Sequence, residues 1–213
     1  MNEIIVTSVK EINKKKLLLY INYEEGFALY KGEFRRFHLK EGERINEEVY
    51  EEIIKTLTKR ATLRAMSLLT NKDYAKAELI TKLEQSKYPK ESINKAIAYV
   101  ESYGYIDDYR YAYNYFNFKA ANKSKRQIEM KLMQKGIDSN IINEISDEFY
   151  ENNQECELNQ SIKLLRKKCK LAENEYIEEL DYKDKNKLMA YLFRKGYSMD
   201  IINKALECII KAY

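Results

Sequence analysis

The hydrophobic positions follow two different periods along the chain, and the change comes near residue 46. Before it, short runs of β-branched and aromatic residues are separated by polar segments that contain Gly26 or Gly32. Such segments are typical of hairpin loops, where glycine supplies a positive φ. The runs are Ile4–Val9, Lys16–Tyr23, Phe27–Tyr30 and Phe34–Leu39. The sequence predicts an antiparallel sheet of three or four strands, too small to be stable alone and therefore packed on the next helix.

After residue 46 the pattern is helical to the end of the chain. Asn46 is a predicted N-cap, followed by apolar residues at helical spacing up to Thr58. Pro89 suits the first turn of a helix, where its missing N–H leaves no donor unpaired. Three glycines each follow a helical pattern and are predicted helix C-caps: Gly104, Gly136 and Gly196.

Aligning these caps shows a repeat, L-x4-[YI]-x4-I-x2-[AI], that begins at Leu83, Leu132 and Leu192. The third copy is spaced further along, which places an insertion at residues 171–183. Each copy has another helical pattern upstream, so the sequence predicts three tandem units of three short helices. The fold class is mainly α, with a β region and a helix at residues 1–60 and repeats at 61–106, 107–152 and 153–213.

Charge is balanced overall, with 38 Lys and Arg against 34 Asp and Glu, so any polyanion contact must come from local clusters. Two basic runs stand out: Lys119, Lys123, Lys125, Arg126, Lys131 and Lys135 with one acid, Glu129, and then Lys163, Arg166, Lys167, Lys168 and Lys170 with none. Ser124 is a predicted N-cap with Gln127 three residues later. A basic helix start of this kind is a phosphate-binding position; the alternative is a solvated lysine-rich face.

Nucleophile and metal chemistry have few candidates. The three cysteines form no C-x-x-C pair, which favours a reducing, cytoplasmic compartment. Cys169 lies within a basic run, which can lower a thiol pKa, but an inert thiol is the favoured interpretation. His38 is the only histidine and falls in a predicted strand, where a structural role is expected. Neither a signal peptide nor a membrane span is predicted.

The stretch from Ser102 to Phe118 is rich in aromatic residues around two adjacent acids, Asp107 and Asp108. They would be metal ligands or an acid and base pair, or first-turn residues of a helix. Adjacent helical residues point about 100° apart, which favours the helix-start role. The expected inward face of this helix contains Tyr111, Ala112, Tyr115 and Phe116. The remaining aromatics, Tyr109, Tyr113 and Phe118, would stack on bases or a partner, or are ordinary surface residues.

The motif Gly104-Tyr105-Ile106-Asp107-Asp108, with Tyr111-Ala112 and Tyr115 after it, resembles the signature of the RecX family, bacterial regulators of the RecA recombinase. Ile128, Leu132 and Lys135-Gly136-Ile137 extend the similarity. It covers residues from about 61 to 210 and is strongest from 78 to 142. Two positions depart from the family pattern: Asn122-Lys123-Ser124 replaces a glycine beside a basic residue, and Lys87 replaces a cap glycine.

The resemblance implies a non-catalytic protein of DNA repair and the SOS response that binds the RecA–DNA filament and most often inhibits homologous recombination. It implies no cofactor and no metal, weak contact with single- or double-stranded DNA, no membrane partner and a monomer. The expected filament- and DNA-binding residues are Arg110 and the two basic runs. Two other hypotheses remain at this point: a helical-repeat adaptor that binds only proteins, and a metal-dependent nuclease that uses Asp107 and Asp108.

Overall fold

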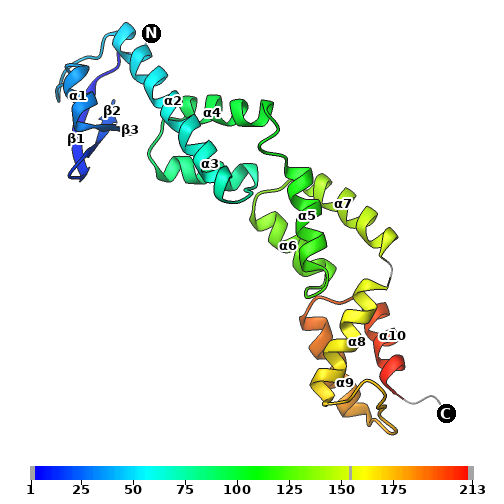
Figure 1. The fold of residues 1–213 in the computed structure, drawn as a ribbon. Helices are drawn as coiled ribbons and strands as arrows, with labels where there is room; N and C mark the ends of the chain where they lie inside the picture. The colour runs from blue at the N-terminus through cyan, green and yellow to red at the C-terminus, as the bar shows by residue number, and fades with distance from the viewer. Residues whose placement is uncertain (1–2, 154, 211–213) are drawn as a thin grey trace. The chain divides into compact units, whose positions relative to one another are not determined.

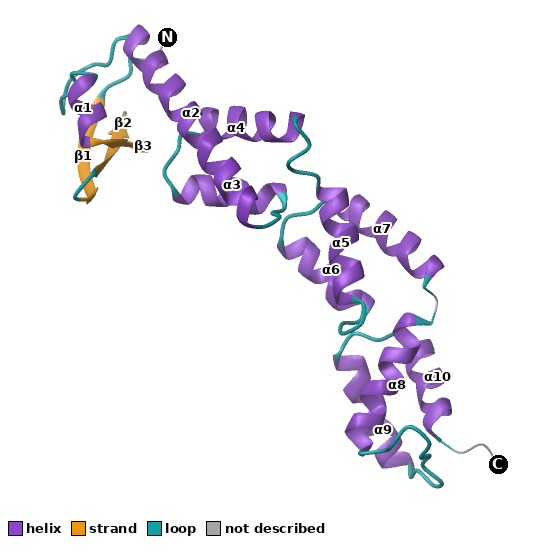
Figure 2. Cartoon of the chain, viewed as in Figure 1, coloured by secondary structure: helices purple, strands orange, loops and turns teal. Residues whose placement is uncertain are grey.

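The computed structural model describes residues 3–153 and 155–210. The chain divides into two compact units, residues 1–107 and 108–213, and each is described by itself. Strands occur only in the first unit among the described residues (Figures 1 and 2). No described helix is both long enough and apolar enough to cross a bilayer.

The sheet of the first unit is antiparallel in the order β1-β2-β3. Its strands are β1 (Val6–Asn13), β2 (Lys16–Ile21) and β3 (Glu24–Tyr30). The turn between β2 and β3 takes its positive φ from Asn22 and Tyr23, at 50° and 70°, so the expectation that Gly26 supplies it is wrong. Gly26 lies within β3, where a Cβ would come within 2.8 Å of Ile21 Cγ1 and 2.9 Å of the Leu19 carbonyl oxygen. This glycine is needed for space.

The predicted fourth strand, Phe34–Leu39, is also wrong. The segment instead begins in helix α1 (Lys31–Arg36), which includes Gly32. The Glu33 carboxylate accepts the Tyr30 N–H at 2.8 Å and starts the helix. Phe37 and Leu39 are nevertheless buried, because they pack in the sheet's core from the turn that follows α1. The hydrophobic spacing predicted the burial of these residues correctly but not their conformation.

Helix α2 (Glu47–Asn71) joins the sheet to the helical part of the first unit. As predicted, the Asn46 side chain caps it by accepting the Glu48 N–H at 3.1 Å. Ile53 and Leu57 pack against Leu19 and Phe27 of the sheet. The two helical patterns that the sequence placed before and after residue 60 form one continuous helix, so this residue lies in mid-helix.

The remaining helices complete three triplets, as the repeat predicts. They are α3 (Lys76–Gln85), α4 (Lys90–Ser102), α5 (Asp108–Lys119), α6 (Lys125–Gln134), α7 (Ser139–Asn152), α8 (Cys156–Cys169), α9 (Tyr182–Arg194) and α10 (Met199–Ile209). In each triplet the third helix packs on the other two: α4 on α2 and α3, α7 on α5 and α6, and α10 on α8 and α9. Figure 1 shows the α5–α7 and α8–α10 triplets of the second unit.

The repeat positions form the triplet cores. Eleven of the twelve are buried, and Tyr88 is half-buried: Leu83, Ile93 and Ala96; Leu132, Ile137, Ile142 and Ile145; Leu192, Tyr197, Ile202 and Ala205. The motif therefore describes how the second and third helices of each triplet pack. The predicted insertion corresponds to the connection between α8 and α9, where the Ile177 N–H donates to the Ile209 carbonyl at 2.8 Å.

The glycines after helices adopt the left-handed conformation expected of C-caps, with φ of 66° at Gly104, 79° at Gly136 and 90° at Gly196. Lys87 has a φ of 61° although it has a Cβ. The backbone at this cap therefore keeps its geometry where glycine is missing. Pro89 lies one residue earlier than predicted, at the N-cap of α4.

Candidate functional site

The start of α6 is closed by side chains of the protein. The Lys125 backbone N–H donates to the Glu157 carboxylate at 2.7 Å. Ser124 is fully buried, and its hydroxyl donates to the Lys195 carbonyl at 2.7 Å while it accepts the Gln127 N–H at 3.4 Å. The predicted N-cap is confirmed. The phosphate site expected at this helix start stays a prediction, and the internal carboxylate at the amide end weighs against it.

Buried polar groups surround this contact. Burial raises the pKa of Glu157, and hydrogen bonding and charge from Lys125 offset part of that effect. Burial also raises the pKa of Tyr150, with Glu157 contributing in the same direction. The Cys156 thiol lies 3.7 Å from the Ala120 carbonyl. These groups connect the α5–α7 triplet to the α8–α10 triplet, so the start of α6 is a joint between the two.

Several cations of the first basic run are engaged inside the protein. Lys125 Nζ lies 3.0 Å from Asp147 and 5.6 Å from the centre of the Tyr150 ring. Lys135 Nζ lies 5.5 Å from the centre of the Tyr111 ring. Lys131 donates to the Gln134 side chain at 2.8 Å. Lys119 and Arg126 are exposed and Lys123 is half-buried; with Arg110, exposed on α5, these are the accessible cations of this segment.

The second basic run separates into structural and accessible residues. Arg166 Nη1 donates to the carbonyls of Ala172 and Glu175 at 2.7 and 2.9 Å. It therefore holds the connection before α9, and its expected role as a phosphate ligand stays a prediction. Lys168 lies over the Tyr191 ring, 5.6 Å from its centre. In this run, Lys163, Lys167 and Lys170 are exposed and have neither an ion pair nor a ring contact among the described residues.

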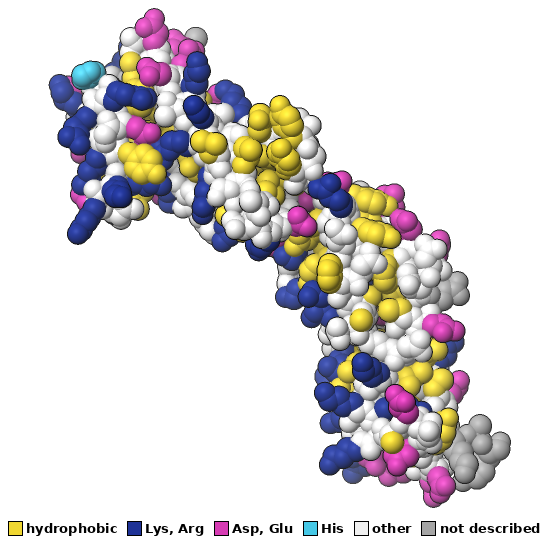
Figure 3. Space-filling model, viewed as in Figure 1, with side chains coloured by type: hydrophobic (Ala, Val, Ile, Leu, Met, Phe, Trp, Pro, Cys, Tyr) yellow, Lys and Arg dark blue, Asp and Glu magenta, His cyan; other side chains and the backbone are white. Residues whose placement is uncertain are grey.

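Charge in the second unit is segregated by helix. Helix α7 carries Glu144, Asp147, Glu148 and Glu151 and no basic residue. Helix α9, whose basic residues lie outside the two predicted basic runs, adds Lys183, Lys185, Lys187 and Arg194 against Asp184 alone. In the view of Figure 3, dark-blue side chains gather over α6 and α9 and magenta ones over α7. The unit therefore has a basic side, which a polyanion would contact.

The aromatic segment contributes packing and surface in different places. Ala112 and Phe116 are buried as predicted, whereas Tyr111 and Tyr115 are half-buried with their rings stacked 6.4 Å apart. The surface aromatics differ too. The Tyr109 hydroxyl donates to Glu148 at 2.9 Å, Tyr113 is exposed, and Phe118 has 79% of its surface exposed.

Asp107 and Asp108 lie where α5 begins, and the helix starts at Asp108. Nowhere in residues 3–153 and 155–210 do three His, Cys, Asp or Glu residues gather in a way that would hold a metal ion. Tyr105, earlier in the same motif, is exposed. The position of the two acids fits the helix-start interpretation.

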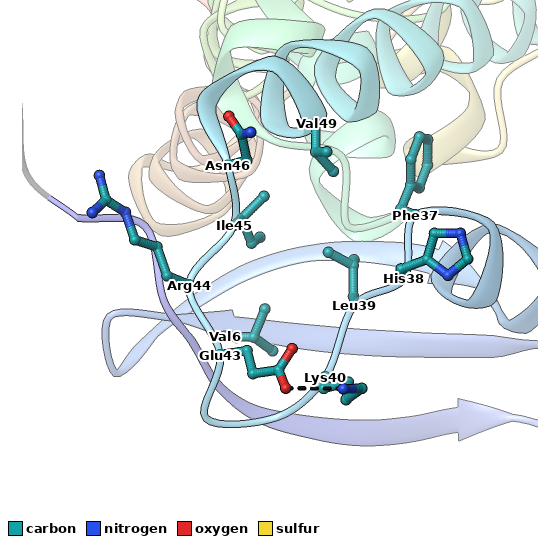
Figure 4. A pocket seen from close by; sticks show the side chains of 10 residues that line it. All are labelled: Val6, Phe37, His38, Leu39, Lys40, Glu43, Arg44, Ile45, Asn46 and Val49. Atoms are coloured by element: carbon teal, nitrogen blue, oxygen red, sulfur yellow. Dashed lines mark hydrogen bonds and ion pairs between the residues drawn. The ribbon is translucent and has the colours of Figure 1, made fainter.

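His38 lies at a small pocket of about 160 Å³ in the first unit. Figure 4 shows it beside Phe37 and Leu39, with the Lys40–Glu43 ion pair at the other side. His38 follows α1 in the left-handed conformation, with φ of 52°, and not in a strand as predicted. Apolar and polar residues line this pocket in equal number, and Lys40 and Glu43 pair with each other at its edge. The sequence places no nucleophile beside His38, so a structural role remains the interpretation of this histidine.

Of the two interpretations of Cys169, the structure supports the inert thiol. Burial raises the pKa of Cys169, and the neighbouring Lys168 lowers it by less than burial raises it. The hypothesis of a lowered pKa at Cys169 is therefore wrong. Partial burial on the side of α8 that packs toward α10 explains the direction.

Comparison with known proteins connects this architecture to a family. The family model of the second three-helix domain of RecX matches residues 107–145, and that of the third three-helix domain matches residues 155–206. A regulatory protein RecX of Finegoldia magna is 30% identical over 192 residues, covering 88% of this chain and 91% of that protein. The chain belongs to the RecX family. Its function class is that of a RecA regulator without catalysis.

Other RecX proteins agree along the full length. One from Clostridium botulinum is 29% identical over 213 residues, covering 97% of this chain and 96% of the relative. A crystal structure of a regulatory protein RecX has a TM-score of 0.62 at 19% identity and covers 96% of this chain and 99% of its own. That of RecX from Lactobacillus salivarius has the same TM-score at 21% identity, covering 73% and 97%. These structures share the fold.

Proposed function

We propose that this RecX-family chain regulates RecA by docking on the RecA–DNA filament, where its basic side faces the nucleic acid. The observation that carries the proposal is the segregation of charge in the second unit. Basic residues on α6, α8 and α9 are exposed, whereas α7 is acidic. A surface of mixed charge would have no preferred side toward phosphates. A surface with segregated charge would turn its basic side toward them.

The cations available for phosphate contact are fewer than the sequence predicted. They are Lys119, Lys123, Arg126, Lys163, Lys167 and Lys170. Two of them, Lys163 and Lys167, lie four residues apart in α8, and Lys170 is the left-handed C-cap that follows the helix. Because the four-residue spacing places Lys163 and Lys167 on one helical face, these two lysines would contact neighbouring phosphates together. The acidic α7 would then face protein or solvent.

The mechanism we propose is steric and electrostatic. The chain occupies a filament surface that DNA strands or RecA subunits need, and so inhibits recombinase activity. It acts as a monomer in the cytoplasm, and its own affinity for DNA is weak, since the net charge is only +4. The repeats at residues 107–152 and 153–213 would each contribute part of the contact.

The test is a titration of RecA-catalysed ATP hydrolysis and strand exchange on single-stranded DNA with this protein below the RecA concentration. We expect both rates to fall. Lys163→Gln with Lys167→Gln should need more protein for the same inhibition, whereas the matched pair Lys82→Gln and Lys90→Gln, exposed in the first unit, should not. Unchanged rates over the whole titration would reject the proposal.

A protein-only docking mode is the second candidate, favoured by the internal engagement of Lys125, Arg166 and Lys168. In that mode the protein still inhibits RecA, but inhibition has little dependence on salt. A slope of log affinity against log salt that is unaffected by Lys163→Gln with Lys167→Gln would support it.

A further inference from the structure

The β1–β2 turn and helix α1 form a second concentration of positive charge, in the first unit. Residues 10–16 and 30–36 contain seven basic residues against two acidic ones. The local excess of five equals that of residues 119–135, where six basic residues face one acid. In Figure 3, dark-blue side chains cluster over this β region and α1. We call Lys14, Lys15, Lys16, Lys31 and Arg35 the N-terminal basic surface.

Backbone hydrogen bonds bring these residues together. The Asn13 side chain accepts the N–H groups of Lys15 and Lys16 at 2.9 and 3.0 Å, which fixes the turn. The Lys31 N–H donates to the Lys15 carbonyl at 2.9 Å, so α1 begins against that turn. Arg35 Nε donates to the Lys31 carbonyl at 3.3 Å. The cations are therefore carried by a fixed backbone and need little ordering on binding.

The two acids of this region are already neutralised. Glu11 pairs with Lys31 at 3.0 Å. Glu33 pairs with Arg60 at 2.7 Å, and both side chains are largely buried. In contrast, Lys14, Lys15, Lys16 and Arg35 have no ion pair within the described residues. Desolvating them against a partner would break no existing salt bridge.

A cleft adjoins the surface along the sheet. It has a volume of about 500 Å³ and is lined by Lys10, Lys16, Tyr20, the acids Glu11 and Glu25, and the turn between α3 and α4. Both acids are neutralised by ion pairs, Glu11 with Lys31 and Glu25 with Lys87. Beside it, Tyr30 keeps 41% of its surface exposed, with Lys16 Nζ 5.1 Å from the centre of its ring. Cations interleaved with tyrosine rings beside an open cleft suit a nucleic-acid backbone better than an apolar partner.

We infer that the N-terminal basic surface binds the phosphate backbone of DNA, as a contact separate from the one proposed for the second unit. The β region would then add a second nucleic-acid contact, carried by the first unit. The inference concerns DNA alone and does not depend on filament docking. Single- and double-stranded DNA share the backbone chemistry, so both belong in the test.

The test measures binding of the full chain to fluorescent 30-residue oligonucleotides, single- and double-stranded, at several salt concentrations without RecA. The variant is Lys14→Gln with Lys15→Gln, whose side chains have no ion pair or hydrogen bond with any of the described residues. We expect affinity to fall several-fold and the slope of log affinity against log salt to decrease by about 1.4–1.8. Lys82→Gln with Lys90→Gln is the control, because it changes net charge equally and should leave the slope unchanged.

Three results would overturn the inference. The first is an unaltered salt slope in the Lys14→Gln with Lys15→Gln variant. The second is an equal loss of DNA affinity in the control, which would indicate a diffuse effect of net charge. The third is loss of RecA binding with unaltered DNA binding, which would assign the surface to protein. Melting temperatures of the two variants verify that both are folded. RecA ATPase inhibition is measured separately, so failure of filament docking remains distinguishable.

Discussion

The Glu157 carboxylate accepts the backbone N–H of Lys125 at 2.7 Å, across 32 residues of sequence. This one contact joins the start of α8 to the start of α6. The amide end of α6 therefore already has an internal anion. For this reason we assign the proposed phosphate contacts to exposed lysines and not to the helix start. The contact also makes Glu157 the residue whose substitution reports most directly on the joint.

Glu157→Ala should destabilise the protein by about 1–2 kcal/mol, because it leaves the Lys125 N–H without its acceptor. Glu157→Gln keeps a carbonyl acceptor and avoids the desolvation of a charge, so it should cost less than the alanine variant. Urea unfolding followed by circular dichroism measures both. Equal losses in the two variants would show that the acceptor at this position is unimportant.

The same residue has a predicted pH dependence. The pKa of Glu157 is raised in the folded protein, mainly by burial. A raised carboxyl pKa means that the unfolded chain loses this proton first as pH rises. The stability contributed by Glu157 therefore falls as pH rises from the unfolded value, about 4.3, to the folded one. Relative to wild type, Glu157→Gln should be more stable at pH 7 than at pH 4. An opposite trend in urea unfolding would contradict the raised pKa.

Two cap glycines form a matched pair. A Cβ at Gly196 would lie 2.9 Å from Ser124 Oγ and 3.3 Å from Arg126 Cβ, whereas one at Gly104 would meet no atom within 4 Å. Both have positive φ, so alanine costs about 1 kcal/mol of backbone strain at each. Gly196→Ala should lose about 1–3 kcal/mol more by overpacking. Thermal unfolding of the two variants tests this. Equal decreases in melting temperature would contradict the close packing at Ser124.

Lys170→Gly should stabilise the protein. Lys170 is exposed and ends α8 with φ of 57°. Glycine removes about 1–2 kcal/mol of left-handed strain and adds roughly 0.5–1 kcal/mol of unfolded-state entropy, leaving a gain of about 0.5–1 kcal/mol. Lys167→Gly, inside the same helix, is the control and should destabilise. Both remove one cation, so only the stability measurement separates them.

Arg166 and Lys163 should respond differently to neutralisation. Arg166→Gln loses the hydrogen bonds to Ala172 and Glu175 and should lower the unfolding free energy by about 1–3 kcal/mol. Lys163→Gln should leave stability within about 0.5 kcal/mol. Thermal unfolding alongside salt-dependent DNA binding tests this. A stable Arg166→Gln variant would return Arg166 to the set of accessible cations.

Much of the helical fold could be predicted from the sequence, because the repeat consists of positions that are buried or half-buried in each triplet. Leu83, Leu132 and Leu192 are all buried at the same position of their triplets. The family motif around Gly104 and Asp108 likewise lies at a helix boundary, where local backbone chemistry determines the residue type. Such features depend on neighbours a few residues away, which is the range over which sequence patterns are informative.

The site depended on contacts that no local pattern contains. Lys125 and Arg166 look equal to Lys163 in the sequence, yet each has a partner brought to it by packing. Phe37 and Leu39 showed by their spacing that they would be buried, and only the tertiary contacts determined that a helix and turn, not a strand, would bury them. The sequence by itself determined the repeat, its caps and the family. The tertiary structure decided which cations remain exposed to contact a ligand, because the partners of a charged side chain come from distant parts of the sequence.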